Sequence, residues 1–247
     1  QMLLQRGLAV PVWGWADAGE QVAVKFAGDQ QQTIADKRGR WKVRLKPLKA
    51  SARGRTFEVT GKNRIVLKDV LVGDVWVCSG QSNMEWATRS TLNAKAELRT
   101  ATYPTIRLFD VPGHTTSAVA RTDVPGGRWQ TCSPQSVSGF SAVGYFFGRH
   151  INTETGIPVG LIGTNWGGTR IEPWTPPVGF RGVSELKTIA DLVDRFDPTI
   201  PAGRATWDAH LKAVEDWVAR TRSALNSGSD LPTAPTTPGL TRPQQPT

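Results

Sequence analysis

The first quarter of the chain alternates polar and apolar residues in short runs, which is the pattern of half-buried β-strands. The alternation is clearest at residues 21–26 (Gln-Val-Ala-Val-Lys-Phe) and 41–45 (Trp-Lys-Val-Arg-Leu). Turn residues separate the runs at 17–19 and 36–40. Short strands at this spacing predict a β-sandwich of the immunoglobulin-like or jelly-roll type, which we assign to residues 1–68.

The pattern changes after Asp69, where longer apolar runs begin to alternate with helical ones. Residues 70–78 and 159–164 are apolar enough to form buried strands. Residues 142–155 have helical spacing and are followed by Gly156, which favours a helix end there. Strands that alternate with helices predict a mostly parallel sheet.

The last part of the chain is helical first and then rich in proline. Residues 207–225 place apolar side chains at helical spacing. From residue 226 the chain consists largely of Ser, Gly, Thr and Pro, which is typical of a linker, and we place a linker at 226–247. A second stretch of this kind, at 112–138, predicts a long loop.

The charge of the chain says little about a partner. The 247 residues carry a formal charge of +9, from 30 Lys and Arg against 21 Asp and Glu. The basic residues are scattered, which favours a generally basic surface over a nucleic-acid site. No apolar run approaches the ~18 residues that cross a bilayer, and the first residues lack the apolar core of a secretory signal. We therefore expect neither a nucleic acid nor a membrane as partner.

Cysteine and histidine are too few for a disulfide framework or a metal cluster. Cys78 and Cys132 are able to form one bridge, but nothing in the sequence requires it. His114, His150 and His210 are well separated, and the chain has no Cys-x-x-Cys pair. We therefore expect no metal site and no cofactor.

One segment suggests a reaction, because a serine follows a buried strand. Residues 79–83 read Ser-Gly-Gln-Ser-Asn, and α/β proteins place reactive groups just beyond the carboxyl ends of their strands. Ser82 is therefore a candidate nucleophile, and Gly168, after the second buried strand, offers a backbone N–H to an oxyanion. Spacing alone favours a turn or N-cap serine, since Met84 stands where Gly-x-Ser-x-Gly has its second glycine.

Several blocks of the sequence resemble the sialate O-acetylesterase family of the SGNH hydrolase superfamily. The nucleophile block is Val-Gly-Asp-Val-Trp-Val-Cys-Ser-Gly-Gln-Ser-Asn-Met at 72–84, and a second block is Asn-Trp-Gly-Gly-Thr-Arg-Ile-Glu-Pro-Trp at 165–174. Residues 129–134 and 140–146 also resemble the family. The matches cover residues 2–225 in the family's order, which makes the resemblance specific.

The resemblance implies a fold, an activity and a site. Residues 69–225 are similar to part of an SGNH hydrolase domain, which is a flavodoxin-like α/β/α fold. Ser82 is implied as the nucleophile, and the backbone amides of Ser82 and Gly168 as part of the oxyanion hole. The implied reaction is hydrolysis of acetyl esters on sialic acid or another glycan, without a metal. The residues expected to line the sugar pocket are Gln81, Asn83, Trp166, Arg170 and Trp174.

Two blocks of the family do not occur in this sequence. One resembles Gln-Gly-Glu-Ser-Asn and supplies a further oxyanion donor, and the other, of the type Asp-x-x-His, supplies the base. We therefore expect a truncated chain with weak activity or none. His114 is the best placed substitute, although a solvated loop residue is the favoured interpretation. His150 is interpreted as a helix-end residue and His210 as a packed or surface residue.

Other side chains have a functional and a structural interpretation. Surface or salt-bridge roles are favoured for Glu85 and Glu172 over a pair of catalytic carboxylates. Arg170 is suited equally to a substrate carboxylate and to an ion pair with Glu172. Three tryptophans in strand patterns are expected in the core: Trp13, Trp41 and Trp76. Three near the strand-end loops are better pocket candidates: Trp86, Trp166 and Trp174.

Two functions without esterase activity stay open at this point. A non-catalytic carbohydrate-binding module would use the β-sandwich and exposed tryptophans, and a pseudoenzyme would keep the fold without the reaction. The family resemblance implies a secreted or periplasmic protein. The sequence leaves the oligomeric state open.

Overall fold

The computed structural model describes residues 1–113 and 119–238. The chain divides into two compact units. Unit 1 comprises Gln1–Gly113 and Val124–Gly168, and unit 2 comprises His114–Asp123 and Thr169–Thr247. All of the strands named below belong to unit 1.

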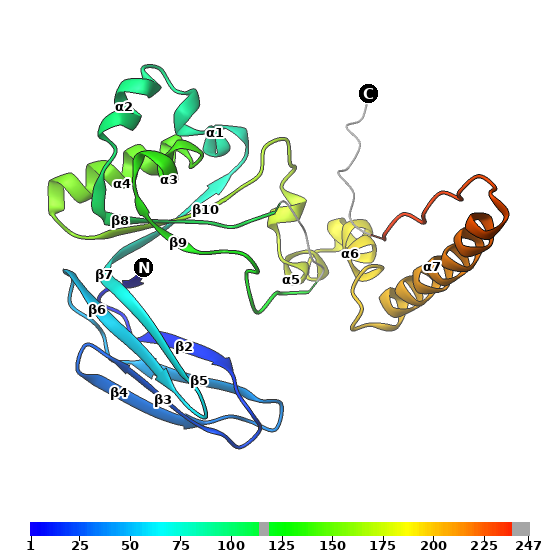
Figure 1. The fold of residues 1–247 in the computed structure, drawn as a ribbon, viewed down its shortest axis with the longest axis horizontal. Coiled ribbons are helices and arrows are strands. Elements are labelled where there is room, and N and C mark those ends of the chain that lie inside the picture. Colours follow the sequence, from blue (N-terminus) through cyan, green and yellow to red (C-terminus); the bar gives the residue numbers. More distant parts are fainter. Residues whose placement is uncertain (114–118, 239–247) are drawn as a thin grey trace. The chain divides into compact units, whose positions relative to one another are not determined.

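The N-terminal strands of unit 1 form two sheets (Figure 1). The small sheet is an antiparallel pair of β2 (Val10–Trp15) and β5 (Arg40–Leu45). In the larger sheet the order is β4-β3-β6-β7, all antiparallel, and β1 pairs with β7 in parallel. The bounds of these strands are β1 Met2–Gln5, β3 Gln21–Phe26, β4 Asp29–Ile34, β6 Ser51–Thr60 and β7 Arg64–Gly80.

One hydrophobic cluster draws on both of these sheets. Val43 and Leu45 of β5 belong to it together with Val24 of β3 and Phe57 of β6. Because side chains alternate between the faces of a strand, every second residue of β5 is buried and the others are exposed. The strands predicted at 21–26 and 41–45 are confirmed as β3 and β5.

Strand β7 runs across the predicted boundary between residues 68 and 69 and enters a second part of the same sheet. There β7 pairs in parallel with β10 (Val159–Asn165), and β10 pairs in parallel with β8 (Tyr103–Asp110). The predicted mostly parallel sheet is confirmed. At the edge, β9 (Trp129–Cys132) is antiparallel to β8.

The prediction of one long loop over 112–138 is wrong in its second half. That half contains β9 and helix α3 (Pro134–Ser138). The ring of Trp129 lies 5.4 Å from that of Phe109 and holds β9 against β8. Ser133 begins α3 with a capping box, in which its side chain accepts a hydrogen bond from the backbone N–H of Ser136.

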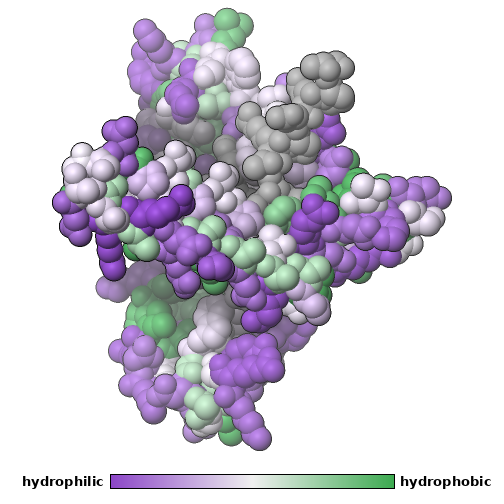
Figure 2. Space-filling model, turned by 90° about the vertical axis from the view of Figure 1, so that its right-hand side faces the viewer, coloured by the Kyte–Doolittle hydropathy of each residue, from purple (hydrophilic) through white to green (hydrophobic). Residues whose placement is uncertain are grey.

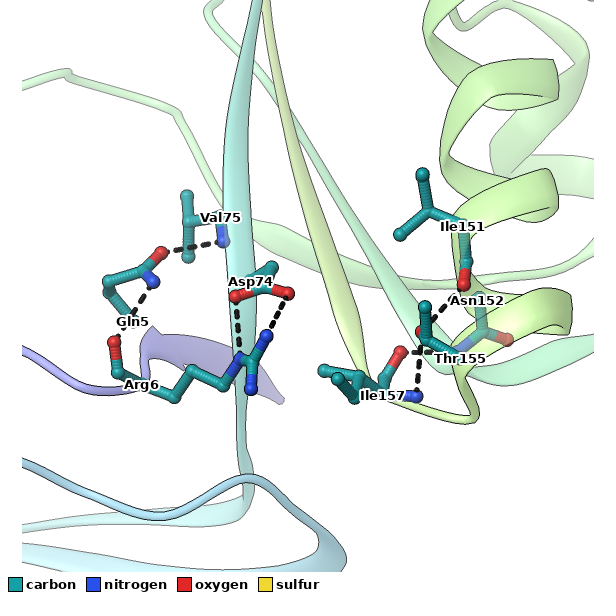
Figure 3. Close-up of polar contacts among 8 residues, drawn as sticks. All are labelled: Gln5, Arg6, Asp74, Val75, Ile151, Asn152, Thr155 and Ile157. Atoms are coloured by element: carbon teal, nitrogen blue, oxygen red, sulfur yellow. Dashed lines mark hydrogen bonds and ion pairs between the residues drawn. The ribbon is translucent and has the colours of Figure 1, made fainter.

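Helix α4 (Ala142–Thr155) forms as its sequence predicts and packs on β10. The Ser141 hydroxyl accepts a hydrogen bond from the Gly144 N–H at 3.1 Å and caps the first turn. Gly156, with φ +65°, ends the helix. From the last turn of the helix, the Asn152 side chain donates a hydrogen bond to the carbonyl of Ile157, the residue after Gly156, at 2.7 Å (Figure 3). The shorter helices of unit 1 are α1 Ser82–Glu85, η1 Thr88–Ser90 and α2 Ala94–Thr100.

The described residues of unit 2 are helical or irregular. Arg181 forms ion pairs with Asp194 and with Asp197, and a small hydrophobic cluster forms around Phe180. The long helix α7 (Pro201–Ser227) contains the predicted helix 207–225 and begins with proline, whose missing N–H costs nothing there. The other helices of unit 2 are η2 Glu172–Trp174, α5 Pro177–Arg181, η3 Ser184–Leu186 and α6 Lys187–Asp194.

The three tryptophans predicted for the core do not share one environment. Trp41 is buried as expected, but Trp13 is 58% exposed and Trp76 is 44% exposed. Trp13 lies on the outer face of β2, and Trp76 packs edge-on against Phe147 of α4 with its ring centroid at 5.1 Å. Figure 2 shows hydrophilic residues over most of the face that it presents, with smaller hydrophobic areas between them.

Both cysteines are expected to resist alkylation in the folded protein. Cys78 and Cys132 are free and buried, and burial raises the pKa of both thiols, that of Cys132 to about 12. At pH 8 only a fraction on the order of 10⁻⁴ of Cys132 is then thiolate, the reactive form. Iodoacetamide at pH 8 should modify neither cysteine until guanidinium chloride unfolds the chain. Rapid labelling of either native thiol, measured by mass spectrometry against free glutathione, would show that this packing is wrong.

Candidate active site

Ser82 stands at the end of the central strand of unit 1. Strand β7 ends at Gly80, and α1 begins at Ser82. Gly80 has φ +147°, a conformation that favours glycine, and its missing side chain leaves room for Met84. Gln81 holds the N-cap position, so the N-cap interpretation of Ser82 is wrong. Ser82 is the first helical residue and is exposed.

The loop after β10 reaches the same edge of the sheet. Strands β7 and β10 are parallel neighbours, and Asn165 is the register partner of Gly80. The Trp166 N–H then donates to the Gly80 carbonyl at 2.9 Å. Two loops that are about 85 residues apart in the sequence therefore begin side by side, as expected at the carboxyl ends of parallel strands.

Gly167 lies directly against Ser82. A β-carbon on Gly167 would stand 3.4 Å from both Cα and Cβ of Ser82 and would overlap the carboxylate of Glu85. The Gly167 N–H donates to Glu85 Oε2 at 2.6 Å, a charge-assisted hydrogen bond. Gly168 follows with φ +71° and is exposed. The backbone N–H of Gly167 is therefore already hydrogen-bonded to Glu85, and Gly168 is the next residue along the loop.

Glu85 and Gly167 are the residues that sequence reasoning missed. The sequence favours a surface or salt-bridge role for Glu85, and the structure adds a hydrogen bond that its carboxylate accepts from the loop beside Ser82. A signal was present, because Glu85 stands three residues after Ser82 and one turn of helix places such residues on one face. Gly167 is the first of two consecutive glycines, and only the close approach to Ser82 shows why it lacks a side chain.

The other expected pocket residues fall into two groups. Gln81 and Asn83 flank Ser82 and are exposed, and Trp166 is half-buried in the neighbouring loop. Arg170 and Trp174 belong to unit 2, where the Trp174 indole N–H donates to the Thr169 hydroxyl at 2.9 Å. Trp86 is 56% exposed, and its indole N–H donates to the Ser90 carbonyl at 3.1 Å. Unit 1 therefore brings Gln81, Asn83 and Trp166 to Ser82.

His150 is too far along α4 to contact Ser82. The Ser141 hydroxyl donates to Met84 Sδ at 3.3 Å, so the first end of α4 is the one beside α1. His150 comes nine residues later, which is about 13 Å further along the helix axis at 1.5 Å per residue. His210 belongs to α7 of unit 2, with its ring 6.2 Å from that of Trp207. His114 lies outside the described residues.

Two kinds of feature are absent from the residues that the structure describes. No group of three or more His, Cys, Asp or Glu side chains is arranged to hold a metal ion. No helix among them combines the length and the apolar composition that crossing a membrane requires.

A cavity of about 510 Å³ lies elsewhere in unit 1. Figure 3 shows two contacts beside it, a two-pronged ion pair of Arg6 with Asp74 at 2.8 and 3.0 Å and a hydrogen bond from the Val75 N–H to Gln5. Asp74 precedes Gly80 by six residues of extended strand, or about 20 Å, so this cavity is separate from Ser82. Its lining residues are Gln5, Arg6, Gly7, Leu48, Lys49, Ala50 and Asp74.

Removing the Glu85 carboxylate is expected to loosen the loop beside Ser82. In Glu85→Ala the Gly167 N–H loses its acceptor, whereas Glu85→Gln keeps an oxygen in place. A misplacement of about 1 Å costs up to about 10²-fold in rate, so we expect Glu85→Ala to lower any Ser82-dependent reaction by roughly ten- to a hundredfold. Glu85→Gln should retain most of the rate. Equal losses in both variants would mean that the negative charge, and not the hydrogen bond, matters.

This chain is similar to known proteins in both sequence and structure. The family model described as "Carbohydrate esterase, sialic acid-specific acetylesterase" matches residues 72–225. Sialate O-acetylesterase of Rattus norvegicus is 34% identical over 186 residues, which cover 66% of this chain and 33% of that protein. The Homo sapiens protein of the same name is 34% identical over 196 residues, which cover 70% of this chain and 37% of that one.

A solved structure is similar as well. A carbohydrate acetylesterase from Xanthomonas citri superposes with a TM-score of 0.69 at 35% sequence identity, over 74% of this chain and 42% of that one. The chain thus spans about a third of the length of the curated relatives that it matches.

Proposed function

Because this chain belongs to the sialic acid-specific acetylesterase family of carbohydrate esterases, we propose that it acts on acetyl esters of sugars with Ser82 as the nucleophile. The observation that carries the proposal is the position of Ser82. It is exposed at the end of β7, and the glycine loop that follows β10 lies against it. An acetylated sugar or glycan is the proposed substrate.

In the proposed reaction the Ser82 hydroxyl oxygen attacks the acetyl carbonyl carbon. A base takes the hydroxyl proton, and the carbonyl oxygen becomes negative. The backbone N–H groups of Ser82 and Gly168 are proposed to hold that oxygen, since the Gly167 N–H already donates to Glu85. One such donor lowers the barrier by about 3 kcal/mol. The ester bond then breaks, the sugar hydroxyl leaves with a proton, and water hydrolyses the acetyl-serine.

The base is proposed to come from outside unit 1. His150 stands about 13 Å along α4 from the helix end beside α1. No other histidine is present in the described part of unit 1. Without a positioned base a serine hydrolase loses most of its rate and keeps only the share from the oxyanion hole and binding. Since unit 1 supplies no base and the Asp-x-x-His block of the family does not occur in this sequence, we expect the 247 residues alone to release acetate slowly.

The finer features of the fold and pocket are part of the same proposal. We assign residues 1–68 to an immunoglobulin-like or jelly-roll sandwich, 69–225 to part of an SGNH hydrolase domain, and 226–247 to a linker. The common cluster of the two N-terminal sheets supports the sandwich. The side chains proposed to contact the sugar are Gln81, Asn83, Trp166, Arg170 and Trp174.

The proposal is tested by supplying the base from solution. The protein is mixed with O-acetylated sialic acid at increasing imidazole concentration, and the acetate released is measured. We expect protein-dependent release of the O-acetyl group that rises with imidazole, and no release of the N-acetyl group of the same sugar. Absence of release at every imidazole concentration would contradict the proposal. Equal binding of acetylated and bare sugar without release would favour a non-catalytic binding module.

A further inference from the structure

The outer face of the small β2–β5 sheet carries two exposed tryptophans. Along β2, Val10 is buried in the N-terminal core, whereas Trp13 is 58% exposed and Trp15 is 55% exposed. Gly14 between them lies on the inner face, where a β-carbon would come within 2.8 Å of the Trp41 ring. Since Trp41 already fills that space, the side chains on either side of Gly14 must face outward.

Strand β5 adds basic residues to the same face. Arg40, Lys42 and Arg44 are exposed and alternate with buried residues. In the antiparallel register, Lys42 is directly opposite Trp13, and Arg40 is directly opposite Trp15. Such partners have their β-carbons about 5 Å apart. The face therefore carries a ladder of alternating aromatic and basic side chains, which we call the Trp13–Trp15 ladder and define as Pro11, Trp13, Trp15, Arg40, Lys42 and Arg44.

Most of the basic side chains of the ladder form no ion pair among the described residues. Arg40 forms an ion pair with Asp36 at 3.2 Å, in which both side chains are about half exposed. Within the described residues, neither Lys42 nor Arg44 forms an ion pair with an acidic side chain. Neither β2 nor β5 contains an aspartate or glutamate. The surface is thus positive as well as aromatic, and it complements an anionic partner.

We propose that the Trp13–Trp15 ladder is a second carbohydrate-binding surface, distinct from the Ser82 site, that holds a glycan with carboxylate groups. An indole ring offers a flat apolar face to the C–H face of a sugar, and Lys or Arg donates charge-assisted hydrogen bonds to a carboxylate. The choice of a glycan as the anionic partner rests on the proposed function. The ladder belongs to the N-terminal sheets of unit 1, whose core is a separate cluster from the one beneath Ser82.

The surface would hold the polymer while acetyl groups are removed elsewhere. A polymer bound at a second site on the same molecule reaches the first at a raised effective concentration. This gain applies only to polymeric substrates. Loss of the ladder should therefore leave the reaction with a small acetyl ester unchanged.

Titration calorimetry with de-O-acetylated polysialic acid tests the ladder without any esterase step. The double variant Trp13→Ala, Trp15→Ala should bind at least about tenfold more weakly than the native chain, as expected for aromatic anchors of a binding surface. Lys42→Glu should weaken binding further than Lys42→Arg does. The matched controls are Leu92→Ala, which removes a 91% exposed apolar side chain before α2, and Lys95→Glu on α2, and neither should change the affinity. Neutral dextran should bind more weakly than polysialic acid.

Three results would overturn the inference. The first is native-like binding by the double variant while its urea unfolding curve matches that of the native chain. The second is no binding of polysialic acid by the native chain. The third is tighter binding of a short DNA duplex through the same residues, which would make the ladder a nucleic-acid surface. Imidazole-dependent release from 4-nitrophenyl acetate, measured on the same samples, reports on the Ser82 site separately, so the two proposals fail independently.

Discussion

Alanine in place of Ser82 is expected to abolish the imidazole-dependent release of acetate. The hydroxyl is the atom that forms the new bond to the acetyl carbon, so no base in solution can replace it. A positioned base contributes about 10²–10⁴-fold. Free imidazole is not positioned, and we therefore expect a rise toward the lower end of that range in the native chain. In Ser82→Ala the rate should equal that of imidazole without protein.

Ser79→Ala is the matched control for this experiment. Ser79 is exposed on β7, the strand that leads to Ser82, and precedes Ser82 by three residues. Its register partner in β10 is Thr164. Its loss should leave the imidazole-dependent rate within about twofold, since an exposed substitution away from the reacting atoms rarely costs more than ~0.5 kcal/mol. Equal rates in native and Ser82→Ala proteins would show that the acetate is released at another group.

Gly73→Ala is expected to destabilise unit 1 by about 3 kcal/mol or more. Gly73 pairs with Gln5 of β1, and the next residue of β7 pairs with Val159 of β10. A β-carbon on Gly73 would overlap the backbone carbonyl of Pro158. A side chain could rotate away from such a clash, but a backbone carbonyl cannot. Overpacking typically costs ~1–3 kcal/mol, and a clash between two backbones in a shared strand belongs at the upper end.

Urea unfolding, followed by circular dichroism, measures this loss. Gly139→Ala is the control, because a β-carbon there would meet only the end of the Arg89 side chain at 3.2 Å, with φ −90°. We expect the control to change the unfolding free energy by no more than about 0.5 kcal/mol. A Gly73→Ala protein as stable as the control would show that β7 is not packed against the Pro158 carbonyl.

The elements with a clear period could be predicted from the sequence. The two-residue alternation of β3 and β5 follows from a core on one side and water on the other. Helix α4 was predictable at both ends, because Ser141 caps it and Gly156 has the left-handed conformation that ends it. Ser82 could be identified as a candidate because an apolar strand leads directly into it.

Features that depend on the register between strands could not be predicted. Trp13 and Trp41 both occur in strand patterns, but only the pairing of β2 with β5 determines that Trp41 faces the core and Trp13 the solvent. Likewise, the roles of Gly167 and Gly168 separate only once Glu85 is seen to accept the Gly167 N–H. Strand β9 was missed because its four residues are too few for a period to appear.

The position of the acetyl group on the protein tests the central claim most directly. Because 4-nitrophenolate leaves more readily than the serine oxygen, acylation by 4-nitrophenyl acetate should be faster than hydrolysis of the acetyl-serine, and the chain should accumulate acetyl-enzyme when it is incubated with this ester. Peptide mapping by mass spectrometry then locates the group. The account predicts acetylation of Ser82 in the native chain and its loss when urea unfolds the protein first. Acetylation that spares Ser82, or that is equal in folded and unfolded protein, would contradict it.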